Sequence, residues 1–320
     1  MALKKKVLLK AFLSITLLSG GLVISSCAHK ETEAYKAKQA QIYYQEGLKY
    51  FQRGDYEKAA EKFRKAQQYM AYLTPEQIKT LNYDLAVALY KAGKYEDAIL
   101  ELEDFIKFYP SAPQIEQAYV MLIKAYLKIS PDAWRDQTYT EKALRLAKKF
   151  LQLYPDSPYR PQVEELIFEA KRKLAKHQYL IAKFYEDYGY YYPAAVRFEY
   201  LLLTYPDFIN YQDVLFHYIK NLYLVPKYAR KKEEYFHDLY EELKEKIQKG
   251  ELEDKKAAQK RLEFYEQQIQ RWEKIAKEAV KKGDENLKIY AQKFGKDKNY
   301  QLLLKIKKGE WSQSWVEKLF

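Results

Sequence analysis

The stretch at residues 82–110, NYDLAVALYKAGKYEDAILELEDFIKFYP, decides the fold of this chain. Apolar residues recur in it at spacings of three and four, the pattern of an amphipathic helix, on both sides of Gly93. Glycine allows the positive φ of a tight turn, and Pro110 ends the second helix. Ala86 and Ala98 are small, so the two helices can approach closely. The stretch therefore predicts a hairpin of two packed helices.

The same pattern occurs twice more along the chain. Residues 43–66 repeat it around Gly54, and residues 178–206 repeat it around Gly189. All three segments match the 34-residue tetratricopeptide repeat (TPR) in their small residues and in the bulky residue that follows, although the first lacks the closing proline. Because stacked hairpins bury a continuous core once at least three are present, the pattern predicts a solenoid.

Two less regular units extend this solenoid. One lies at residues 115–155 and is interrupted at 130–139, and a degenerate fifth unit is expected at 211–246. The predicted fold is thus all-α, a TPR-like helical-hairpin solenoid of about five units over residues 36–246. A charged helical C-terminal extension follows at 247–320.

The extension allows two interpretations. Residues 255–281 form a charged helix with an apolar stripe, and the remainder is basic and carries Trp311 and Trp315. It is either a pair of capping helices that shield the last repeat or a basic amphipathic contact with lipid or a partner. We favour the cap.

The N-terminus has the features of an export signal. Lys4, Lys5 and Lys6 precede an apolar stretch at 11–24, which is short for a spanning helix. The sequence Ile-Ser-Ser-Cys then ends at Cys27, the only cysteine of the chain, and resembles a bacterial lipobox. We predict a lipoprotein signal peptide at 1–26 and a lipidated tether at 27–35. A plain signal peptide or an uncleaved anchor is the alternative.

By the sorting habit of such lipoproteins, Ala28 after the cysteine favours the periplasmic face of the outer membrane. The predicted membrane attachment is the covalent lipid on Cys27, and no other cofactor is expected. Cleavage would remove four lysines and lower the net charge from +12 to +8. Lysines and glutamates are interleaved along the helices, so the surface charge is that of a solvated helical protein and nucleic acid is not an expected partner.

The sequence offers no catalytic constellation. A single cysteine excludes a disulfide framework and a cysteine-ligated zinc site. The four histidines form no HExxH or other metal spacing, and P-loop, GxGxxG and GxSxG motifs are absent from the sequence. We therefore predict a protein that binds other proteins and is not an enzyme, with no metal site.

Tyrosine is abundant, with 33 residues, and marks a candidate peptide-binding groove. In TPR stacks, defined positions of the first helix of each repeat line a concave surface. Those positions hold Tyr44, Leu48 and Phe51 in the first unit, Tyr83, Val87 and Tyr90 in the second, and Tyr119, Leu122, Tyr126 and Ile129 in the third. Tyrosine supplies contact area at low entropic cost together with a hydrogen-bonding tip. The alternative is that half of these tyrosines pack between neighbouring first helices.

A family resemblance adds to this interpretation. The stretch Arg172-Lys173-Leu174-Ala175-Lys176-His177-Gln178-Tyr179, with Tyr205-Pro206-Asp207 after it, resembles the BamD lipoproteins of the outer-membrane β-barrel assembly machinery. The similarity covers about residues 36–225 and includes Phe105-Ile106-Lys107-Phe108-Tyr109-Pro110. The extension has no counterpart in the family member compared.

The resemblance implies two partners. One is a large outer-membrane barrel protein with periplasmic POTRA domains, bound through the C-terminal repeats. The other is unfolded outer-membrane protein, whose C-terminal aromatic signal is read by the N-terminal repeats. Two rival functions remain open: a pilotin-type TPR lipoprotein that assists secretin, pilus or other envelope complex assembly, and a periplasmic enzyme or its regulatory subunit.

Overall fold

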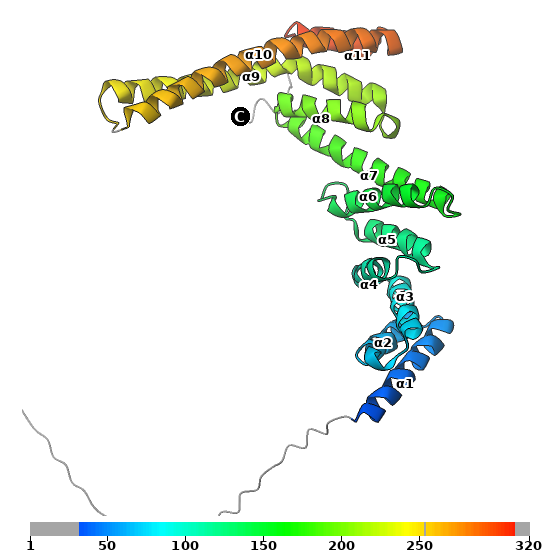
Figure 1. The fold of residues 1–320 in the computed structure, drawn as a ribbon. Coiled ribbons are helices and arrows are strands. Elements are labelled where there is room, and N and C mark those ends of the chain that lie inside the picture. Colours follow the sequence, from blue (N-terminus) through cyan, green and yellow to red (C-terminus); the bar gives the residue numbers. More distant parts are fainter. Residues whose placement is uncertain (1–31, 253, 311–320) are drawn as a thin grey trace, which may run out of the picture.

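The computed structural model describes residues 32–252 and 254–310 of the chain. These residues form eleven α-helices and two short 3-10 helices, with no strand among them (Figure 1). The all-α, TPR-like fold predicted from the sequence is thereby confirmed. The predicted signal peptide, Cys27 and the start of the tether lie outside the described residues, as do Trp311 and Trp315.

Four helical hairpins follow one another in a curved stack (Figure 1). They pair α1 (Glu33–Gln52) with α2 (Tyr56–Gln67), α3 (Pro75–Lys91) with α4 (Tyr95–Phe108), α5 (Ile115–Ile129) with α6 (Thr138–Leu153), and α7 (Arg160–Asp187) with α8 (Tyr191–Thr204). Two 3-10 helices, η1 (Met70–Tyr72) and η2 (Pro206–Phe208), lie in the connections after α2 and α8. The interruption expected at 130–139 is the connection between α5 and α6.

The turns within the hairpins form as the glycines predict. Gly54, Gly93 and Gly189 have φ values of 76°, 77° and 75°, in the left-handed region that other residues rarely adopt. Each of these glycines directly follows the last turn of a first helix and precedes a second helix. A single glycine therefore determines the geometry of each of these three turns.

Small residues allow the close helix contacts. Ala86, Ala125 and Ala182, at equivalent places in α3, α5 and α7, are fully buried. In α1 the equivalent residue is Gly47, where an added Cβ would lie 2.5 Å from ring atoms of the buried Phe63 on α2. The backbone of α1 thus lies directly against an aromatic ring.

The fifth unit differs from the prediction of a hairpin within 211–246. The chain there forms one continuous helix, α9 (Tyr211–Gln248), and its partner is α10 (Lys255–Phe294), followed by α11 (Lys298–Lys307). This segment has no glycine between Gly189 and Gly250, and so lacks the residue that forms the tight turns of the first, second and fourth hairpins. Pro226 lies inside α9 but does not end it.

The C-terminal half of α10 and all of α11 cover the last repeat. Leu287 and Tyr290 of α10 and Leu303 and Ile306 of α11 are buried in one core with α8 and α9. Tyr223 of α9 donates a hydrogen bond of 2.8 Å to Asp284, whose carboxylate also accepts one of 2.6 Å from Lys307. This packing is what the capping interpretation predicts. The opposite ends of α9 and α10, which meet near Gly250, project beyond the stack as an arm (Figure 1).

We expect Gly47→Ala to destabilise the first hairpin by about 1–3 kcal/mol, because the new methyl group overlaps the Phe63 ring. The midpoint of chemical denaturation, compared with that of the wild type, measures the effect. Lys49→Ala on the exposed face of α1 is the control and should leave the midpoint nearly unchanged. An unchanged midpoint for Gly47→Ala would show that the helices do not meet as closely as described.

Candidate protein-binding sites

A pocket of about 490 Å³, here the α4–α6 pocket, lies where α4, α5 and α6 meet. Its lining residues are Glu103 and Ile106 of α4, Tyr119, Leu122 and Tyr126 of α5, and Lys142, Arg145, Leu146 and Lys149 of α6. The α5 side chains give it an aromatic and aliphatic floor, and α6 gives it a basic wall. Its size is within the range of ligand-binding clefts in proteins.

Electrostatic contacts hold the aromatic floor of this pocket in place. The Tyr126 hydroxyl donates a hydrogen bond to the Glu103 carboxylate, and burial raises the pKa of Tyr126 well above its usual value. The Lys142 Nζ lies 5.6 Å from the ring centroids of both Tyr126 and Tyr139, a cation–π geometry. Tyr126 therefore remains neutral at physiological pH and presents its ring between a carboxylate and an ammonium group.

The basic wall is only partly neutralised. The Arg145 guanidinium lies 3.6 Å from Glu141 at an exposed position, and Lys149 has no carboxylate partner among the residues described. Surface pairs of this kind contribute little and are easily exchanged for a ligand. The pocket thus combines apolar area with available positive charge, which suits a peptide that carries both an aromatic side chain and a carboxylate.

Tyr83 of α3 starts a chain of two hydrogen bonds that reaches α5 and the residue just before α7. Its hydroxyl donates to the Gln117 Oε1 at 2.8 Å, and the Gln117 amide donates to the Tyr159 hydroxyl at 2.8 Å. The Tyr83 ring also packs on Phe105 with centroids 5.2 Å apart. Burial, with the nearby Asp84, raises the pKa of Tyr83 to about 12. Burial likewise raises the pKa of the Asp84 carboxyl to about 6.

The predicted groove residues outside this pocket are buried or half-buried. Tyr44 is buried, and Leu48, Phe51, Val87 and Tyr90 are half-buried. The Phe51 ring contacts Tyr56 and Phe63, and the Tyr90 ring contacts Tyr95. The structure brings three of the predicted residues, Tyr119, Leu122 and Tyr126, into one pocket. Peptide binding by the set stays a prediction.

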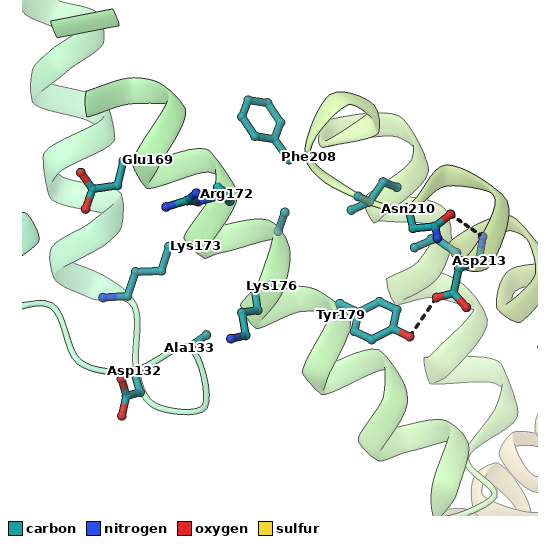
Figure 2. Close-up of a pocket in the computed structure, with 13 residues that line it drawn as sticks. Asp132, Ala133, Glu169, Arg172, Lys173, Lys176, Tyr179, Phe208, Asn210 and Asp213 are labelled. Carbon is teal, nitrogen blue, oxygen red and sulfur yellow. Dashed lines mark hydrogen bonds between the residues drawn. The ribbon is translucent and has the colours of Figure 1, made fainter. Parts of the chain in front are cut away.

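A larger cleft of about 760 Å³, here the α7–α9 cleft, lies farther along the stack (Figure 2). Its lining residues are Asp132 and Ala133 of the α5–α6 connection, Glu169, Arg172, Lys173, Ala175, Lys176 and Tyr179 of α7, Phe208 of η2, and Ile209, Asn210, Asp213 and Val214 at the start of α9. Arg172, Lys173 and Lys176 project from one side of α7 beside the loop that carries Asp132.

A buried charge cluster fixes α9 against α7 beside this cleft. The Glu186 side chain is 1% exposed and accepts hydrogen bonds from the His217 Nδ1 at 2.8 Å, from Lys183 at 2.6 Å and from Asn221 at 2.5 Å. Lys220 adds a fourth contact at 3.2 Å. Burial alone would raise the pKa of the Glu186 carboxyl, but the hydrogen bond and charge of His217 and the charges of both lysines outweigh it, so this pKa lies well below its ordinary value.

Two further features of the described residues bear on other kinds of site. No group of three or more His, Cys, Asp or Glu side chains there is arranged to hold a metal ion. None of the described helices combines the length and apolar character needed to cross a bilayer.

Comparisons with known proteins identify the family. A family model described as an outer membrane lipoprotein, YfiO, matches residues 36–236. A putative outer membrane protein assembly factor BamD of Aquifex aeolicus is 43% identical over 293 residues, which cover 91% of this chain and 95% of that protein. The chain belongs to the BamD family.

More distant relatives match a smaller share of the chain. The outer membrane protein assembly factor BamD of Caulobacter vibrioides is 25% identical over 193 residues, or 60% of this chain and 63% of that protein. The BamD of Rickettsia prowazekii is 25% identical over 203 residues, or 63% of this chain and 79% of that protein.

Sequence reasoning missed several lining residues in this BamD family member. Lys142, Arg145 and Lys149 lie on the second helix of their hairpin, whereas the groove prediction rests on positions of first helices. Lys176 and Tyr179 occupy the same repeat positions in α7 as nominated groove positions in the earlier units. Extending the repeat phase to the fourth unit would have found the last two, whereas nothing in the repeat pattern marks the α6 residues.

We expect Glu186→Gln to lower the stability of the fourth and fifth units by about 3 kcal/mol at neutral pH, because it removes the buried carboxylate that pairs with the half-buried Lys183 and Lys220. A carboxyl whose pKa is depressed on folding stabilises the fold above its ordinary pKa and loses that contribution as the pH falls. The difference from the wild type should therefore shrink as the pH falls below 4.5.

Denaturation midpoints measured across this pH range test the prediction. The control is Glu164→Gln, which removes an exposed ion pair with Arg160 and should cost less than about 1 kcal/mol. A Glu186→Gln protein as stable as the control, or a difference that grows in acid, would contradict the account of the cluster.

Proposed function

We propose that this protein is a lipid-anchored scaffold of outer membrane protein assembly that binds other proteins and performs no catalysis. The observation that carries the proposal is the similarity to the Aquifex aeolicus protein, which extends over 91% of the chain and therefore reaches into α10, beyond the predicted solenoid. A stack of helical hairpins fits a scaffold, because it presents an extended and rigid surface.

The anchor in this proposal is a lipid on Cys27, which holds the chain at the periplasmic face of the outer membrane. The family description, outer membrane lipoprotein, supports it, and so does the lipobox-like sequence that ends at this cysteine. Two or more acyl chains are needed for stable attachment, since one chain binds a bilayer only marginally.

The partners in this proposal are a POTRA-containing barrel protein and unfolded outer-membrane protein clients. The α4–α6 pocket supports the client role, because an aromatic floor beside a basic wall suits the C-terminal end of a client that carries an aromatic side chain. Its carboxylate would lie near Lys142, and its side chain would lie over Tyr119 and Leu122. Aromatic contacts and charge-assisted hydrogen bonds would then act on the same residue of the client.

We expect Tyr126→Ala and Lys142→Ala each to weaken client binding roughly tenfold, as truncation of a central contact does. The measurement is the fluorescence anisotropy of a labelled peptide with an outer-membrane protein C-terminus, titrated with full-length protein. The same peptide with an amidated C-terminus should bind the wild type more weakly. Tyr235→Ala and Lys256→Ala on the distant arm are the controls, and equal affinities for all these variants would reject the pocket as the client site.

We expect Cys27→Ser to abolish incorporation of labelled palmitate and to release the protein from washed membranes, because the acyl chains attach through the thiol. Ser26→Ala keeps a small residue before the cysteine and is the control that should stay anchored. A Cys27→Ser protein that remains lipid-labelled and membrane-bound would overturn the proposed anchor.

A further inference from the structure

The connection between α5 and α6 is a loop held in place by hydrogen bonds, and it has no role in the proposed client site. It interrupts the repeat pattern at residues 130–137, between the last residue of α5 and the first of α6. Gln137 is 3% exposed, and its amide donates to the carbonyl oxygens of Asp132 at 2.9 Å and of Arg135 at 3.0 Å. The buried Gln137 side chain thus holds the loop backbone in place by hydrogen bonds.

Two residues of α7 attach this loop to the stack. The Lys173 Nζ donates to the Ser130 carbonyl oxygen at 2.8 Å. The His177 Nδ1 lies 2.6 Å from the Ala133 carbonyl oxygen, so this nitrogen carries the proton and donates. The loop is therefore pre-organised against α7, which lowers the entropic cost of any contact that it makes.

The loop presents one large aromatic side chain to solvent. Trp134 is 70% exposed, at a turn in which the Arg135 N–H donates to the Asp132 carbonyl oxygen at 2.9 Å. Exposed tryptophan on a structured loop has the character of an interaction anchor, because tryptophan and arginine dominate binding energy at protein interfaces. Its neighbours Asp132 and Ala133 line the α7–α9 cleft.

The charges in the cleft are unevenly compensated. The Asp213 carboxylate accepts a hydrogen bond of 2.9 Å from Tyr179 and lies 3.7 Å from the His217 Nε2. Burial lowers the pKa of Lys173, and the negative charges of Asp132 and Glu169 offset this only in part. Arg172 and Lys176 have no carboxylate within ion-pair distance among the residues described, so two cations remain for a ligand.

We propose that Trp134 and the α7–α9 cleft form a second protein-binding surface, which takes an acidic polypeptide segment that also carries an apolar side chain. Carboxylates of the segment pair with Arg172 and Lys176, and its apolar side chain lies against Phe208. The apolar part of the lining is the reason to choose a polypeptide over an inorganic anion, which would leave it uncovered. This surface is distinct from the α4–α6 pocket and takes a different ligand.

The test uses full-length protein in detergent and two labelled synthetic peptides of equal length. Both contain the same Leu and Phe residues, while the polar positions are Asp and Glu in one and Lys in the other. We expect the wild type to bind the acidic peptide roughly tenfold more tightly than the basic one. Arg172→Ala combined with Lys176→Ala, and separately Trp134→Ala, should each weaken binding of the acidic peptide roughly tenfold.

Matched controls separate this surface from general charge and from the client site. Lys256→Ala combined with Lys260→Ala removes two exposed cations from α10, and Tyr235→Ala removes an exposed aromatic from α9; neither should change the affinity. An unlabelled client peptide should displace a labelled client peptide but not the acidic one.

Equal affinity for the two peptides would overturn the proposal, as would control variants that weaken binding as much as the cleft variants. Displacement of the acidic peptide by inorganic phosphate at constant ionic strength would also overturn it, because the surface would then be an anion site. Circular dichroism of each variant verifies that a lost affinity is not lost folding. Failure of the client peptide alone would count against the α4–α6 pocket and leave this surface standing.

Discussion

The close approach of the two helices in each hairpin is the constraint on which the rest of the structure depends. A residue with little or no side chain on the first helix, such as Gly47 or Ala182, lies in the same core as a large buried residue of the second helix, such as Phe63 or Phe198. Successive hairpins then stack with a fixed phase, because each unit repeats the same contact. The phase decides which side chains of different units meet, and both candidate binding sites follow from it.

The sequence predicts the features that single residues determine. Gly54, Gly93 and Gly189 mark turns because only glycine adopts their φ values without strain. The prediction from sequence fails at the fifth unit, where the repeat pattern loses its glycine. No glycine occurs between Gly189 and Gly250, and α9 continues far past the length of a repeat helix. The pocket walls are harder still to predict, because Lys142 and Glu103 come to line one pocket only when α4 and α6 both pack on α5.

The Glu186 cluster illustrates the same limit. Its members come from α7 and α9, and nothing in the local pattern of either helix indicates that a carboxylate, two ammonium groups and an imidazole will share one buried site. Burial of the carboxylate is tolerable only because all these partners are present together. Such a site is defined by tertiary structure, and one sequence read alone does not reveal it.

Two candidate binding sites with different linings lie on one stack of helices, and this arrangement fits the proposed scaffold role. The α4–α6 pocket has an aromatic floor, whereas the α7–α9 cleft has a structured loop and uncompensated cations. The two sites lie at neighbouring core clusters, and α7 contributes buried residues to both clusters. Ligands held at both sites would be kept at a defined separation without any change in the protein. The helices α10 and α11 close the end of this core, so the stack does not expose the apolar face of its last repeat.

The most direct test of the assembly-scaffold account is the composition of the complex in native membranes. The tagged full-length protein would be isolated in mild detergent and its stoichiometric partners identified by mass spectrometry. The account predicts a large outer-membrane barrel protein with POTRA domains. Recovery of a secretin or a cell-wall synthase in place of that barrel protein would contradict it.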